Sequence, residues 1–217
     1  MAFLGFVSER ESQRWQGAPP YIPAFSFHEK HQSAPINATP EAIIQAVLAL
    51  DMAEDPIISR LLMLRQLPTR LRQWFTNTKN TTPAAAFGFD TFTLLHQNTN
   101  EISLGLAGRF WRPTMGVASL ANAEEFAHYN DPAAAKLVLR FNVTHDNAGW
   151  AILITETFVW CPTPQVKARF ACYWGAIRPA SGWIRRRTLL AVQQKLAMRN
   201  GCRYWQRSVG VQRGYQR

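Results

Sequence analysis

Two neighbouring stretches decide the fold: KLVLRFNVTH at residues 136–145 and GWAILITETFVWC at residues 149–161. In both stretches apolar side chains recur at every second position, which is the period of a strand with a buried face. One face of the first stretch carries four apolar residues, Leu137, Leu139, Phe141 and Val143. The residues between the stretches, Asp146-Asn147-Ala148-Gly149, are typical turn formers. The pattern therefore predicts an antiparallel hairpin.

Upstream of this hairpin, the sequence predicts a strand, two helices and a second hairpin. Residues 25–35 form the strand, and Thr39-Pro40 is a typical helix start with Thr39 as the N-cap. A second short helix begins at about Pro56, ends or bends at Pro68, and carries the apolar stripe Ile57, Leu61, Leu64 and Leu67. A polar loop follows at residues 73–86. The predicted second hairpin pairs residues 87–97 with residues 101–112, and a short helix is predicted around residues 124–126.

Downstream of the hairpin, helical spacing replaces the period of two. A helix begins at about Thr163, and we expect Pro179-Ala180-Ser181-Gly182 to break or kink it. A second helical segment runs from Trp183 to Met198 with the apolar stripe Leu189, Val192 and Leu196. Gly201 is expected to end it.

This order of elements predicts an α+β fold: a curved antiparallel sheet wrapped around a long C-terminal helix, with two short helices after the first strand. We expect residues 23–199 to form the domain. Residues 1–22 are predicted to be a poorly ordered leader, because Gly17, Pro19 and Pro20 interrupt regular structure. Residues 200–217 are predicted to be a basic tail. A helix that crosses a curved sheet leaves a concave space, where ligands tend to bind.

The positive charge is concentrated in the last quarter of the chain. The 217 residues carry a formal net charge of +10, and residues 162–217 hold ten Arg and two Lys but no acidic residue. Such asymmetry is typical of a segment that binds anionic lipid or nucleic acid. The alternative is a solvated basic helix and tail that keep the protein in solution.

Other compositional features favour a folded cytoplasmic protein. Apolar residues make up 47% of the chain and charged residues 18%. Cys161, Cys172 and Cys202 match no zinc spacing, so we interpret them as free thiols, with one disulfide as the alternative. The apolar run at residues 1–7 has no basic region before it, and we expect neither a signal peptide nor a transmembrane segment.

Four segments carry a likeness to a known superfamily: PEAI at 40–43, GLAGRFW at 105–111, TETFV at 155–159 and YWGAIRPASGWIRR at 173–186. Through these segments and the order of elements, residues 24–199 resemble the START-like (SRPBCC, helix-grip or Bet v 1-like) superfamily. More narrowly, they resemble its uncharacterised bacterial members labelled polyketide cyclase-like.

The resemblance implies a cavity for a hydrophobic ligand beneath the last helix. Members elsewhere bind lipids, sterols or plant hormones, and some cyclise polyketides. Others hydroxylate aromatics with an added iron domain, and this branch is excluded because the chain has no Rieske-type Cys-His pairing. The resemblance transfers no functional residue.

Glu156 is the candidate catalytic residue. It shares a strand face with Ile152, Ile154 and Phe158. If that face lines the cavity, an unpaired carboxyl group has a raised pKa there and can act as a general acid or base. The alternatives are a structural salt bridge, with Arg109 or Arg178 as partner, or exposure to water at a bulge.

The remaining site candidates are an arginine and aromatic residues. Arg109 lies beside small residues that leave room for it to bind a ligand carboxylate. The aromatic rings line the pocket or belong to the ordinary core. The predicted ligand-binding residues are Arg109, Trp111, Phe141, Glu156, Phe158, Tyr173 and Trp174. The five histidines have no metal-site spacing, so we predict neither a metal nor another cofactor.

Three functions stay open at this point. The first is a carrier or sensor of an apolar small molecule. The second is a cyclase or dehydratase that uses Glu156 as acid or base. The third is binding to an anionic surface through the basic C-terminal quarter. The sequence leaves the oligomeric state open.

Overall fold

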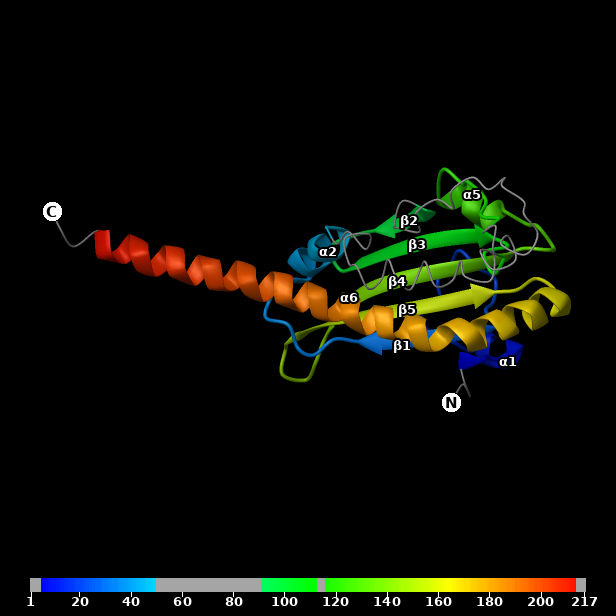
Figure 1. Cartoon of the computed structure of the whole chain (residues 1–217), viewed down its shortest axis with the longest axis horizontal. Helices are drawn as coiled ribbons and strands as arrows, with labels where there is room; N and C mark the ends of the chain where they lie inside the picture. Colours follow the sequence, from blue (N-terminus) through cyan, green and yellow to red (C-terminus); the bar gives the residue numbers. More distant parts are fainter. Residues whose placement is uncertain (1–4, 50–90, 113–115, 214–217) are drawn as a thin grey trace, which may run out of the picture.

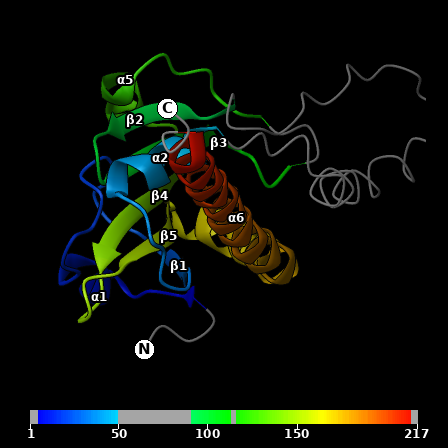
Figure 2. The same ribbon diagram turned by 90° about the vertical axis from the view of Figure 1, so that its left-hand side faces the viewer.

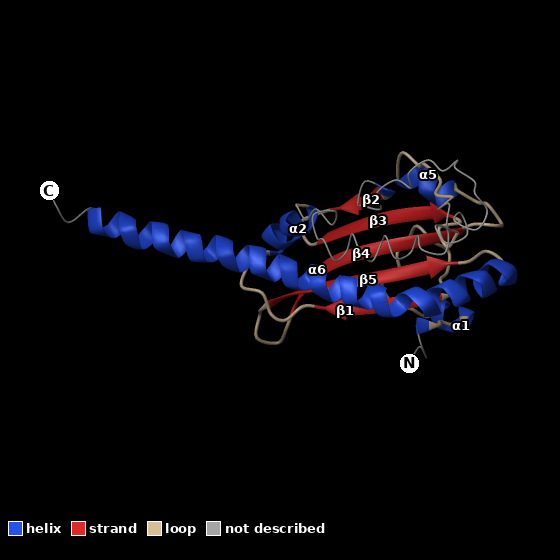
Figure 3. Cartoon of the chain, in the orientation of Figure 1, coloured by secondary structure: helices blue, strands red, loops and turns tan. Residues whose placement is uncertain are grey.

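The computed structural model describes residues 5–49, 91–112 and 116–213, and of residues 199–213 the backbone alone. Its elements, drawn in Figures 1 and 3, follow in the order α1 (Glu9–Gln13), β1 (Phe27–Gln32), α2 (Pro40–Leu48), β2 (Thr93–Gln97), β3 (Glu101–Gly108), α5 (Ala123–His128), β4 (Ala135–His145), β5 (Ala151–Trp160) and α6 (Pro164–Arg213). The protein is therefore α+β, with one antiparallel sheet and a long C-terminal helix, as predicted. The predicted helix from Pro56 and the polar loop at 73–86 lie outside the described residues.

The sheet has five antiparallel strands in the order β1-β5-β4-β3-β2. Both predicted hairpins are confirmed, and β4 pairs with β5 without a register shift. Gly149 closes their turn at φ 83°, a conformation that glycine adopts without strain. The Asp146 carboxylate accepts hydrogen bonds from the backbone N–H groups of Ala148 and Trp150. The Asp146 side chain therefore stabilises the turn through hydrogen bonds within the loop.

Helix α6 covers one face of the sheet, as Figure 2 shows. Two apolar clusters lie between this helix and the strands. One gathers Leu189, Val192 and Leu196 of α6 with sheet residues such as Leu139 and Phe141. The other gathers Val166, Phe170 and Trp174 near the start of α6 with residues such as Phe27, Leu106 and Val159. The predicted segment 183–198 therefore does pack on the sheet.

The opposite face of the sheet is covered by the N-terminal segment and α5. Val7, Ile22 and Phe25 are buried there with Phe126 of α5 and Phe158 of β5. The Val7 N–H donates to the Ser26 carbonyl at 2.9 Å. Residues 5–22 therefore belong to the domain and are not the poorly ordered leader that we predicted. The physical reason is that β5 carries apolar residues on both faces, so both faces need a cover.

Helix α6 is continuous through Pro179, so of the break or kink that we predicted at 179–182 the break is wrong. Pro179 has no N–H to donate to the Gly175 carbonyl, and its ring crowds that carbonyl. Packing on both sides of this point, at Trp174 and Leu189, holds the helix to the sheet. The helix also continues past Gly201 to Arg213, and its last part projects beyond the sheet in Figure 1. The predicted boundary at residue 200 therefore does not coincide with the end of a helix.

The predicted strand at residues 25–35 corresponds to β1, and the predicted helix at Pro40 corresponds to α2. Thr39 caps α2, because its hydroxyl oxygen accepts a hydrogen bond from the Ala42 N–H. At the other end of α2, the Lys195 ammonium of α6 donates to the Ala49 carbonyl at 2.8 Å. This contact fixes where α6 crosses α2.

Candidate functional site

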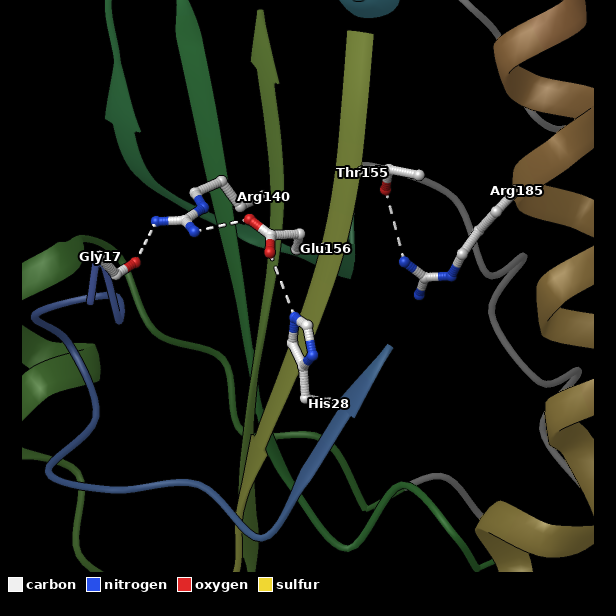
Figure 4. Close-up of polar contacts among 6 residues, drawn as sticks. All are labelled: Gly17, His28, Arg140, Thr155, Glu156 and Arg185. Atoms are coloured by element: carbon white, nitrogen blue, oxygen red, sulfur yellow. Dashed lines mark hydrogen bonds and ion pairs between the residues drawn. The ribbon is translucent and has the colours of Figure 1, made fainter. Parts of the chain in front are cut away.

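Glu156 lies on the sheet face opposite α6, as Figure 4 shows. Its Oε2 accepts a hydrogen bond from Arg140 Nη2 at 2.6 Å, and its Oε1 lies 3.2 Å from His28 Nε2. The three side chains come from adjacent strands, and each is largely buried. The structure therefore places the candidate catalytic carboxylate in a buried ion-pair cluster and away from the space beneath the helix.

The partner of Glu156 follows from the register of the strands. Arg140 is directly opposite Glu156 in the β4–β5 pair, and both side chains lie on the same face. The two partners that we predicted are wrong: Arg109 pairs with Asp131 at 3.2 Å, and Arg178 lies 3.7 Å from Glu29. Arg109 follows the last residue of β3 and is partly exposed, so it cannot reach Glu156 across the sheet.

The electrostatics of this cluster keep Glu156 ionised. Burial by itself would raise the pKa of Glu156, but hydrogen bonds from His28 and Arg140 and their charges lower it to about 2. A carboxyl group with this pKa carries no proton at neutral pH and cannot act as a general acid there.

The N-terminal segment closes the same cluster. The Gly17 carbonyl accepts a hydrogen bond from Arg140 Nη1 at 2.7 Å. The Arg140 guanidinium lies over the Phe158 ring, and the Trp15 ring contacts the His28 ring edge-on. Through these contacts the cluster of Glu156, His28 and Arg140 holds the N-terminal segment against the sheet.

The other predicted ligand-binding residues are divided between three places. Phe141 lies in the apolar cluster under the middle of α6, and Phe158 lies on the opposite sheet face. Trp111, Tyr173 and Trp174 are brought together around Phe170 near the start of α6. Of the seven predicted residues, Trp174 alone lines the hollow described next.

A hollow of about 580 Å³ lies between the outer strand β1 and helix α6. It is lined by aromatic, small and charged residues: Phe6, Glu29, His31, Trp174, Gly175, Arg178, Pro179, Gly182, Trp183 and Arg186. We call this space the β1–α6 pocket. A volume of several hundred Å³ is typical of sites for small organic ligands.

The pocket exists because one face of α6 carries small residues. Gly175, Pro179 and Gly182 recur at the helical spacing of three or four, so no bulky side chain fills the space beneath them. Further along the same helix, Leu189 and Val192 fill the corresponding positions and close the interior. A Cβ atom added to Gly175, an exposed residue of the pocket lining, would meet nothing within 4 Å.

Glu29 and His31 of β1 supply the polar groups of the pocket. Glu29 is only 7% exposed, and its Oε1 lies 3.2 Å from His31 Nε2. Its second oxygen, Oε2, has no hydrogen-bond partner among the described residues. A buried carboxylate oxygen without a donor is unusual in a folded protein.

A row of polar residues continues inward from the pocket. Glu29 is opposite Thr157 of β5, and His31 is opposite Thr155. Arg185 of α6 donates to the Thr155 hydroxyl at 3.4 Å (Figure 4). Thr157 Oγ1 has no hydrogen-bond partner among the described residues. Polar side chains therefore occupy part of the space beneath α6, where a plain core would be apolar.

Burial shifts the pKa values of two residues at or near the pocket, Arg185 and His31. Burial lowers the pKa of Arg185 to about 10, which leaves it cationic at neutral pH. Burial also lowers the pKa of His31, and the charges of Arg185 and Arg186 lower it further while Glu29 opposes them. His31 is therefore largely neutral at neutral pH. The pocket offers a carboxylate, a neutral imidazole and guanidinium groups beside aromatic walls.

Glu29 and His31 are site residues that the sequence prediction missed. Phe27, Glu29 and His31 alternate along β1, and this period of two places the two polar residues on the same face as the buried Phe27. Polar residues on the apolar face of a strand were the signal that could have identified the site.

In comparisons with known proteins, no family model, curated protein or solved structure matches the chain. Among the described residues, no helix has both the length and the apolar character that crossing a membrane requires. The same residues contain no cluster of three or more His, Cys, Asp or Glu side chains suited to hold a metal ion.

Proposed function

We propose that this protein binds an apolar small molecule in the β1–α6 pocket and acts as its carrier or sensor. The observation that carries the proposal is the hollow itself, because it has a ligand-sized volume and aromatic walls. Trp174 is buried at the wall, whereas Phe6 and Trp183 are exposed apolar rings. Exposed rings around a hollow favour entry of an apolar ligand, which would cover them.

We also propose that the fold is a helix-grip fold of the START-like kind. In support, the first strand lies beside the last strand and a helix follows the first strand. The long terminal helix covers the sheet over a polar row and a hollow. The pocket lies at the β1 edge, under residues 174–186 of α6, and not under the centre of segment 183–198, which is filled by apolar side chains.

Fewer observations support the two other functions. A cyclase-type reaction at Glu156 would need a protonated or ligand-facing carboxyl group, and Glu156 is ionised on the far face of the sheet. Anionic-surface binding would use the basic C-terminal quarter, and five of its twelve basic side chains, those after residue 198, are outside the described part of the chain.

The proposal is tested by titration with N-phenyl-1-naphthylamine, a neutral aromatic dye whose emission rises in apolar surroundings. The informative variant is Gly175→Trp, which places an indole in the open space at Gly175. Its matched control is Ala176→Trp, because Ala176 is the next helix residue, is exposed and does not line the pocket. Circular dichroism checks that both variants fold.

We expect the wild-type protein to bind the dye and Gly175→Trp to bind it at least about tenfold more weakly, which corresponds to about 1.4 kcal/mol. The Ala176→Trp control is expected to bind it like the wild-type protein. An absence of binding to the wild-type protein, or equal binding by all three proteins, would refute the pocket as the ligand site.

A further inference from the structure

The charges around the β1–α6 pocket do not balance. Glu29 is the one acidic residue among its described lining residues, whereas Arg178 and Arg186 line it as well and Arg185 lies beneath the helix nearby. Arg178 lies 3.7 Å from Glu29 and offsets its charge. Arg186 is exposed and has no ion pair with any described residue. One guanidinium group at the pocket is therefore available to an anion.

Only one of the two oxygens of the Glu29 carboxylate has a contact among the described residues. Its Oε1 contacts His31 and Arg178, but its buried Oε2 lacks a donor among the described residues. A bound molecule whose hydroxyl group reached this buried oxygen would supply the missing donor, and both partners of Oε1 would keep their contacts.

The two polar groups flank the same helix turn. A Cβ atom on Gly182 would lie 3.3 Å from Glu29 Oε1, so Gly182 marks the point where α6 passes over Glu29. Arg186 follows four residues later, which is one turn or about 6 Å along the helix axis. A flat body of one or two aromatic rings can therefore reach from Glu29 to the Arg186 side chain.

We infer that the ligand is an amphipathic organic acid whose acid group binds Arg186, whose apolar body packs against Trp174 and Trp183, and whose hydroxyl group donates to Glu29 Oε2. This inference rests on the proposed function and specifies its ligand class. A side chain at position 182 would crowd both residues, because an added Cβ atom lies 3.3 Å from Glu29 Oε1 and 3.4 Å from His31 Cε1.

Four naphthalene probes test the inference on the wild-type protein by isothermal titration calorimetry. They are 6-hydroxy-2-naphthoic acid, 2-naphthoic acid, 2-naphthol and naphthalene, which differ in whether they carry the acid and the hydroxyl group. We expect 6-hydroxy-2-naphthoic acid to bind about tenfold tighter than either singly substituted probe, since a hydrogen bond to a charged group contributes about this much.

Two variants assign each advantage to its residue. Arg186→Gln should remove the advantage of 6-hydroxy-2-naphthoic acid over 2-naphthol and of 2-naphthoic acid over naphthalene. Arg169→Gln should keep both advantages, because Arg169 is exposed on α6 outside the pocket. Glu29→Gln should remove the advantage of the hydroxyl-bearing probes. If Glu29→Gln does not fold, the wild-type comparison of the four probes still decides the hydroxyl site.

The outcomes separate this inference from the proposed function. If the protein binds N-phenyl-1-naphthylamine but treats the four naphthalenes alike, the pocket stands and the organic acid is refuted. If Arg169→Gln weakens the acids as much as Arg186→Gln does, the attraction is a general effect of the basic helix and the specific site is refuted. If no aromatic probe binds, both claims fail together.

Discussion

At the scale of single residues, the two acidic side chains on opposite faces of the sheet differ in how fully they are paired. Glu156 has a partner on each oxygen, Arg140 on one and His28 on the other. Glu29 has partners on Oε1 alone. Removing one partner of a fully paired buried carboxylate strongly destabilises a fold, whereas a half-paired carboxylate leaves a hydrogen bond for a ligand.

Removing the charge of Glu156 should destabilise the protein strongly. Glu156→Gln leaves the buried Arg140 guanidinium without its anion, and the expected loss is about 3–5 kcal/mol in the free energy of unfolding. Urea denaturation measures this loss. The exposed Glu124→Gln serves as the control and should change the free energy by less than about 0.5 kcal/mol. Equal effects of the two substitutions would show that the cluster is not structural.

The low pKa of Glu156 also predicts how stability depends on pH. Its pKa falls from 4.5 in the unfolded reference to about 2 in the folded protein, so its contribution is present above pH 4.5. The contribution is lost as the pH falls through the range from about 4.5 to 2, and it amounts to about 3 kcal/mol. Unfolding measured at several pH values should therefore show a steeper loss for the wild-type protein than for Glu156→Gln. Parallel curves would disprove the assignment.

At the scale of elements, α6 combines good packing with poor intrinsic helix formers. Gly175, Pro179 and Gly182 all lie within it, and together they open the pocket. Glycine in a helix interior costs about 0.5–1 kcal/mol relative to alanine, so the pocket is made at the expense of helix stability.

Gly175→Ala should therefore stabilise the protein by about 0.5–1 kcal/mol, because the added methyl group meets no atom within 4 Å. The matched substitution Gly182→Ala should gain less, since its Cβ would crowd Glu29 and His31. Thermal unfolding of the two variants compares them directly. A larger gain for Gly182→Ala would mean that the pocket at Gly182 is wider than described.

Period and capping signals were sufficient to predict most elements. The alternation in β4 and β5 predicted the central hairpin, and Thr39-Pro40 predicted the start of α2. Local sequence signals gave wrong or incomplete predictions at positions where tertiary contacts determine the structure. The helix continues through Pro179 because both flanks pack on the sheet, and alternation alone could not say which face of β5 the helix covers. For that reason the sequence left open whether Glu156 faces the cavity or is paired structurally, and the structure shows it paired with Arg140 and His28.

At the scale of the whole molecule, the sheet is enclosed from both sides. Helix α6 covers one face, and residues 5–25 with α5 cover the other (Figure 2). The N-terminal segment also contributes Phe6, which bridges to β1 and lines the pocket. The segment therefore links the structural cluster of one face with the β1–α6 pocket of the other.

Deleting residues 1–17 should destabilise the protein by more than about 3 kcal/mol. The deletion removes the buried Val7 and Trp15, which contacts His28, and it removes the Gly17 carbonyl that binds Arg140. Urea denaturation of the shortened chain measures the effect. An unchanged free energy of unfolding would mean that these residues are a dispensable leader after all.

Hydrogen–deuterium exchange tests the central claim most directly, because it locates a bound ligand along the chain. With N-phenyl-1-naphthylamine bound, short labelling times should show slower exchange in β1 and in residues 174–186 of α6, which border the pocket. Peptides from α5, on the opposite face, should be unchanged. Protection that appears in α5 and is absent from β1 and residues 174–186 would contradict the claim that the ligand binds between β1 and α6.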